Sequence, residues 1–157
     1  MVKINLVAVG KVKENYFSDG IKEYAKRLSR FCDFNIIEIG EENFSKADDG
    51  TIKIVKDKEG EKISEYLKGY VIAMAIEGKK MSSEKFADKL DAVISRGNGV
   101  MTFVIGGSYG LSDKVKSRAD ELMSFSDMTF PHTLMRVILL EQLYRAFTIS
   151  ADGKYHK

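Results

Sequence analysis

Apolar residues along this chain follow two spacings in turn, and the alternation predicts strands and helices in succession. Short apolar runs predict strands at 2–9, 34–39, 70–76 and 100–105. Apolar residues spaced by three and four predict helices at 13–31, 51–68, from the cap Ser82 to Gly97, and 133–149. This order is typical of an α/β fold with a mainly parallel sheet and flanking helices. Because no repeat or linker interrupts it, residues 1–157 are expected to form a single domain.

The stretch between the fourth strand and the last helix has a weaker pattern. Ser112 and Asp113 are expected to open a short helix that contains Val115, Ala119 and Leu122. Residues 123–130 (MSFSDMTF) alternate like a short strand. Pro131 is the only proline, and it stands where the last helix can begin, because the first turn of a helix tolerates its missing N–H.

Composition limits the classes of function. One cysteine and two histidines exclude an intrachain disulfide and a typical zinc site, so no metal is expected. No apolar run is long enough to cross a membrane, and we expect a cytoplasmic protein without a membrane partner. The net charge of +2 is too small to indicate nucleic-acid binding by itself. Local basic clusters are more simply explained as solvated helix faces.

Three glycines, Gly106, Gly107 and Gly110, follow the fourth predicted strand in FVIGGSYGLS. In parallel sheets, ligands bind beyond the carboxyl ends of the strands, so this loop and those after Ile76 and at 124–131 are candidate sites. The order G-G-x-x-G differs from the dinucleotide fingerprint, and the Gly-Lys-Ser/Thr ending of a phosphate-binding loop is absent. A tight turn without a ligand is the remaining alternative.

Four motifs are characteristic in combination: IGGS-x-G, SFS-x-MTFPH, MR-x-x-L-x-EQ-x-YRA and a terminal YHK. With VAVGKVKENY, DKEGEKI and AIEGK, they cover essentially the whole chain. The chain thereby resembles the RlmH family, small SPOUT-class methyltransferases that methylate N3 of a pseudouridine in helix 69 of 23S ribosomal RNA. The resemblance implies a C-terminal trefoil knot, S-adenosylmethionine (SAM) as the methyl donor, the ribosome as partner and a homodimer.

The resemblance also implies which residues bind SAM. They lie at the end of the third strand, in the glycine turn and in the loop before Pro131: Met74, Gly106, Gly107, Phe125, Ser126, Asp127, Met128, Thr129 and Phe130. Apolar walls and nearby backbone groups suit adenine and a methionine side chain. Phe125, Met128 and Phe130 also fit ordinary core packing.

The reaction implied is methyl transfer from a sulfonium to an imide nitrogen, which needs no metal because the donor is already activated. The imide proton must leave, and His156 and His132 are candidate acceptors because imidazoles exchange protons near neutral pH. Tyr155 or Arg136 could instead stabilise the developing oxygen charge. The choice stays open, and water is a further acceptor. Tyr155 and His156 are expected to fold over the substrate base.

The last predicted helix is apolar almost all round in its first half. A surface helix shows one apolar stripe, so this helix is either central to the monomer or part of an oligomer interface. The resemblance favours a homodimer. Glu141 and Arg145, four residues apart, fit a salt bridge along the helix.

Two other classes of function are weaker alternatives. A non-catalytic RNA- or ribosome-binding module would have no need for the apolar, glycine-adjacent SFSDMTF segment. A Rossmann-like oxidoreductase would carry its glycine fingerprint in the first strand–helix turn, where this chain has only VGKVKEN.

Overall fold

The computed structural model describes residues 1–44 and 48–151. The elements in these stretches alternate as the sequence predicts. They are β1 (Lys3–Val9), α1 (Asn15–Leu28), β2 (Asp33–Ile39), α2 (Asp49–Ser64), β3 (Tyr70–Lys79), α3 (Ser83–Ser95), β4 (Val100–Ile105), α4 (Asp113–Arg118), β5 (Glu121–Met123) and α5 (His132–Ser150). The predicted α/β class is confirmed.

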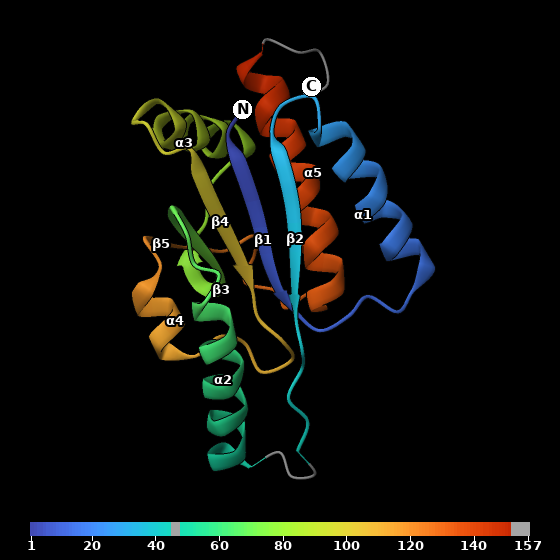
Figure 1. The fold of residues 1–157 in the computed structure, drawn as a ribbon, viewed down its shortest axis with the longest axis vertical. Helices are drawn as coiled ribbons and strands as arrows, with labels where there is room; N and C mark the ends of the chain where they lie inside the picture. Colours follow the sequence, from blue (N-terminus) through green and yellow to red (C-terminus); the bar gives the residue numbers. More distant parts are fainter. Residues whose placement is uncertain (45–47, 152–157) are drawn as a thin grey trace.

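The strands form one sheet in the order β2-β1-β4-β3-β5, and all neighbouring strands run parallel. The mainly parallel sheet predicted from the sequence is therefore confirmed. Because parallel strands point the same way, their carboxyl ends meet at one edge of the sheet, which is the lower edge in Figure 1. The trefoil knot implied by the resemblance stays a prediction.

Helices cover both faces of the sheet, so the protein has three layers (Figure 1). Leu6 and Ala8 of β1 belong to the core that contains residues of α1, α3 and α5. Val7 and Val9 belong to the second core, with residues of α2 and α4. Burial of both faces explains why the central strands are continuous apolar runs rather than alternating ones.

Three helices begin with a side-chain cap. Ser82 and Ser112 accept the backbone N–H of Lys85 and Val115, as their positions in the sequence suggest. Asp48 does the same for Thr51. Each such cap stabilises a helix by about 1 kcal/mol.

Two predictions for the region between β4 and α5 are wrong. The short helix ends at Arg118, so it contains neither Ala119 nor Leu122, and Leu122 belongs to β5. The strand predicted at 123–130 is a loop after Met123. The backbone N–H of Ser124 still donates to the carbonyl of Lys79 in β3. Beyond it, the side chains of Ser124 and Ser126 bond to backbone groups within the loop, a local competition that alternation cannot reveal.

Helix α5 packs between α1 and α3 and against the sheet. Leu139, Leu140 and Leu143 are fully buried there. Packing within the monomer thus accounts for much of the apolar character of α5, and the homodimer stays a prediction. The salt bridge between Glu141 and Arg145 is confirmed, at 2.6 Å.

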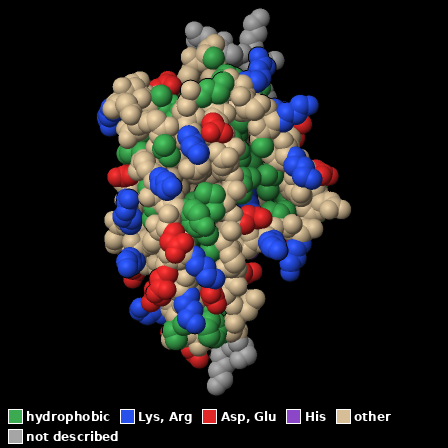
Figure 2. Space-filling model, in the orientation of Figure 1, with side chains coloured by type: hydrophobic (Ala, Val, Ile, Leu, Met, Phe, Trp, Pro, Cys, Tyr) green, Lys and Arg blue, Asp and Glu red, His purple; other side chains and the backbone are tan. Residues whose placement is uncertain are grey.

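On the face of the molecule that Figure 2 shows, Lys and Arg side chains are intermixed with Asp and Glu. This face carries no single block of positive charge, in keeping with the net charge of +2. Within the described residues, no helix has the length and apolar character needed to cross a membrane.

Candidate functional site

A groove of about 700 Å³ opens at the carboxyl ends of β3, β4 and β5. Its walls are residues 74–77 of β3, residues 105–111 and residues 123–132 without Asp127. The glycine turn and the 124–131 segment were expected there from the sequence, whereas of the loop expected after Ile76 only Glu77 lines the groove. Lys116 and Met135 complete it. A position beyond the carboxyl ends of parallel strands is the usual place for a ligand in this class of fold.

The glycine turn forms one wall of the groove. The backbone N–H of Gly110 donates to the carbonyl of Gly107 at 3.0 Å, and Gly110 has a φ of +85°. A Cβ on Gly106 would lie 2.7 Å from the carbonyl carbon of Gly110, closer than real Cβ atoms come. The turn therefore closes on itself at this position, and only a glycine fits there without a shift of the backbone.

A buried carboxylate lies behind the glycine turn. Glu59 of α2 is 3% exposed, and its Oε2 accepts the backbone N–H of Glu42 at 3.1 Å. Burial raises the pKa of Glu59, and the nearby Glu41 and Glu42 raise it further against the effect of that hydrogen bond. Sequence reasoning missed Glu59. The sequence did carry a sign of its burial: Glu59 lies four residues after Val55 and four before Ile63, and this spacing puts all three on the buried side of the helix.

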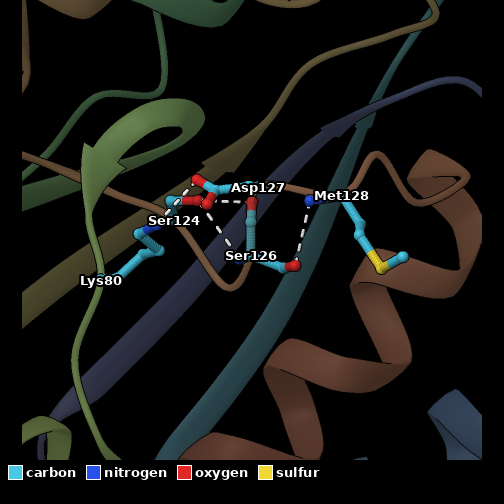
Figure 3. Close-up of polar contacts among 5 residues, drawn as sticks. All are labelled: Lys80, Ser124, Ser126, Asp127 and Met128. Atoms are coloured by element: carbon cyan, nitrogen blue, oxygen red, sulfur yellow. Dashed lines mark hydrogen bonds and ion pairs between the residues drawn. The ribbon is translucent and has the colours of Figure 1, made fainter.

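The loop between β5 and α5 is shaped by short-range hydrogen bonds (Figure 3). Ser124 Oγ donates to the carbonyl of Ser126 at 2.9 Å, and Ser126 Oγ accepts the N–H of Met128 at 3.0 Å. Asp127 Oδ1 lies 2.7 Å from Lys80 Nζ, so the carboxylate joins this loop to the end of β3. These contacts hold the loop in the shape that forms the second wall of the groove.

Many of the residues that line the groove are apolar. Met74 and Met123 are buried at its base, while Phe125 and Phe130 are half-buried along the wall. Three large apolar side chains at the mouth are well exposed to solvent: Ile76, Tyr109 and Met128. A groove of this kind suits a ligand with an extensive apolar surface.

One ion pair lies within the groove lining. Lys116 Nζ of α4 is 2.6 Å from Glu77 Oε1 at the end of β3. The hydrogen bond from Lys116 lowers the pKa of Glu77. The pair supplies a cation and an anion side by side in the groove lining.

Most of the residues predicted for the cofactor site line this one groove. These are Met74, Gly106, Gly107, Phe125, Ser126, Met128, Thr129 and Phe130, together with the candidate proton acceptor His132. Asp127 stands beside the groove with its carboxylate turned to Lys80. Tyr155 and His156 lie outside the described residues, so their predicted role is unaddressed by the geometry.

His132 and Arg136 stand one turn apart at the start of α5. His132 lines the groove, and its Nδ1 is buried without a hydrogen-bond partner among the described residues. Arg136 is not part of the groove lining. It donates to Glu38 at 2.7 Å and to the carbonyls of Val9 and Gly10 at 3.1 and 2.8 Å. The charge-stabilising role suggested for Arg136 stays a prediction, and its contacts point to a different task.

Within the described residues, no group of three or more His, Cys, Asp or Glu side chains is placed to hold a metal ion. The groove lining itself offers an apolar surface, backbone groups and the imidazole of His132.

Comparison with known proteins gives a family. Residues 2–156 match a family model described as "Predicted SPOUT methyltransferase". A Streptococcus thermophilus protein named ribosomal RNA large subunit methyltransferase H is 52% identical, over 99% of this chain and 100% of its own length. Proteins of the same name from Bifidobacterium adolescentis and Clostridium acetobutylicum are 50% and 51% identical over the same shares.

Solved structures share the fold. A methyltransferase candidate from Bordetella pertussis aligns over 92% of this chain and 94% of its own, with a TM-score of 0.58 and 10% identity. Another candidate, from Legionella pneumophila and solved with bound SAM, aligns over 93% and 66%, with a TM-score of 0.50 and 13% identity. With these folds and the full-length match to the family model, this chain belongs to the SPOUT methyltransferases, in the group of the ribosomal RNA large subunit methyltransferase H proteins.

Proposed function

We propose that this protein is a SAM-dependent methyltransferase that modifies large-subunit ribosomal RNA, at N3 of a pseudouridine in helix 69 of 23S RNA. The observation that carries the proposal is the groove itself. Residues predicted for the cofactor site, which lie as far apart in the chain as Met74 and Phe130, line one largely apolar groove beside a glycine turn. Full-length relatives at about half identity support the RNA substrate.

The residues of the groove fit SAM. Its volume of about 700 Å³ lies within the usual range for small-molecule sites. Phe125, Phe130 and Met74 offer apolar surface for the adenine ring and the methionine chain, while the turn at 106–110 offers backbone groups in the groove lining. When bound, SAM supplies a methyl group on a positively charged sulfur, which is already activated for transfer.

The protein's own contribution is alignment and proton removal. Holding two reactants in line lowers a barrier by as much as about 7–11 kcal/mol in favourable cases. His132 lies in the groove lining and is one candidate to take the imide proton. His156 is the other, and Tyr155 beside it is proposed to stack on the extruded base.

A homodimer acting on the ribosome in the cytoplasm completes the proposal. Ile76, Tyr109 and Met128 leave an apolar rim around the groove, which a second copy of the chain or the RNA substrate would cover. The small net charge favours recognition of an assembled particle, where shape adds to phosphate contacts.

The test is methyl transfer from labelled SAM to ribosomes that lack the modification, with the product nucleoside identified. Label in N3-methylpseudouridine is the expected result. Label in another nucleoside would contradict the substrate. Binding to ribosomes without SAM binding or label would favour a non-catalytic RNA-binding module. Gly106→Ala should weaken both SAM binding and transfer, and Gly99→Ala, where an added Cβ meets nothing within 4 Å, is the matched control that should keep both.

A further inference from the structure

A buried cation joins the start of α5 to the ends of β1 and β2. Arg136 is 1% exposed, although it is charged. Its Nη2 donates to the carbonyls of both Val9 and Gly10, and its Nη1 forms an ion pair with Glu38 at 2.7 Å. A buried charge is costly unless it is paired and hydrogen-bonded, so these contacts fix where the guanidinium can lie.

Glu38 reaches Arg136 from the edge strand of the sheet. On β2, Phe34 and Ile36 pack on the core of α1 and α5, and alternation puts Glu38 on the same face. Its side chain keeps 42% of its exposure. Glu38 can therefore be changed without opening a cavity in the core, and it is the accessible half of the pair.

The first turn of α5, which Arg136 joins to β1 and β2, forms part of the groove wall. His132 stands four residues before Arg136 on the same side of the helix, and Pro131, His132 and Met135 all line the groove. The ring of His132 lies against Gly10, where an added Cβ would come 3.5 Å from its Cε1. Gly10 therefore contacts both residues: its carbonyl accepts a hydrogen bond from Arg136, and the ring of His132 lies against its Cα.

We propose that Glu38 and Arg136 are a positioning pair for the methyltransferase reaction. The pair fixes the first turn of α5 on the ends of β1 and β2, and it thereby sets the place of Pro131, His132 and Met135 in the groove. Neither side chain touches the ligand. The inference rests on the proposed function, because it takes the groove as the SAM site.

Glu38→Gln is the variant that tests the pair, since it keeps the size of the side chain and removes its charge. Titration calorimetry, well below the melting temperature, should show SAM affinity reduced roughly 10- to 100-fold, as expected when a wall is displaced. Hydrogen exchange of the ligand-free protein should become faster across 128–136, with the strand interiors unchanged. Turnover at saturating SAM should fall much less than the affinity.

Val93→Ala is the matched control. Val93 is a buried residue of α3 outside the groove, so the variant loses stability but should keep its SAM affinity. Glu38→Asp, which keeps the charge on a shorter side chain, should recover part of the affinity. If Glu38→Gln does not fold, SAM affinity and hydrogen exchange are measured on Glu38→Asp instead.

Two outcomes would overturn the inference. One is unchanged affinity and unchanged exchange across 128–136 in Glu38→Gln. The other is a large loss of turnover at unchanged affinity, which would make Arg136 a catalytic residue. Failure of the wild-type protein to bind SAM would instead overturn the proposed function, while the exchange measurement would still report whether the pair fixes α5.

Discussion

The carboxylate of Glu59 lies directly behind Gly107: a Cβ on Gly107 would stand 3.3 Å from Glu59 Oε1. The glycine turn is therefore enclosed between the groove on one side and a buried acid on the other. The same carboxylate accepts the N–H of Glu42, so it connects the turn after β4 with the segment after β2.

Glu59 gives a prediction about pH. Its pKa is raised in the folded protein, so the folded state binds the proton more tightly than the unfolded state. The contribution of Glu59 to stability is fully present at pH values below 4.5, the ordinary pKa of a glutamate, and it is lost as the pH rises through the raised pKa. Glu59→Gln should remove this loss. At neutral pH we expect a gain on the order of 1 kcal/mol, or about 2–4 °C in melting temperature.

Thermal unfolding of both proteins between about pH 4 and pH 8 checks this, because the difference should grow with pH over that range. Glu61→Gln, an exposed change on the same helix, is the control and should leave the curve unchanged. A Glu59→Gln variant that is less stable than wild type at neutral pH would show that the charged carboxylate stabilises the turn.

Gly106→Ala should weaken SAM binding by about tenfold or more and cost about 1–3 kcal/mol of stability, because the added Cβ cannot fit beside Gly110 without moving the turn. Gly99→Ala is the matched control: a Cβ there meets nothing within 4 Å, and Gly99 has no positive φ. Calorimetry with SAM and thermal unfolding separate the two effects. Equal affinity in both variants would remove Gly106 from the cofactor site.

Removal of Tyr155 to Lys157 should spare SAM binding and reduce methyl transfer to background, because these residues are proposed to act on the base. Tyr155→Phe and His156→Ala then separate stacking from proton transfer. Rates on unmodified ribosomes and SAM affinity are the two measurements. Full activity of the shortened protein would leave His132 or water as the proton acceptor.

Sedimentation at several concentrations should report a dimer. The apolar rim of Ile76, Tyr109 and Met128 is the surface we expect the second copy to approach. Ile76→Glu should then weaken association, with the exposed Ile54→Glu on α2 as control. A wild-type monomer with full activity at working concentration would exclude a role for the partner.

The candidate site shows how far sequence reasoning reaches. The motifs predicted that Gly106, Phe125 and Phe130 lie in the site, and all three line the groove. They could be found in the sequence because a motif is a set of residue types at neighbouring positions in the chain. The partner of Arg136 could not be found in this way. Glu38 is 98 positions away, and nothing in a single sequence connects a guanidinium to one carboxylate among the 23 acidic residues.

The sequence by itself determined the order of helices and strands, their apolar faces and the caps at Ser82 and Ser112, because these depend on residues within a few positions of one another. Only the tertiary structure decided that β1 lies between β2 and β4, that residues 124–130 form a wall rather than a strand, and that Glu59 and Arg136 are buried. The physical reason is that burial and ion pairing depend on which segments meet in space. Local propensity carries no information about partners that are distant in the chain.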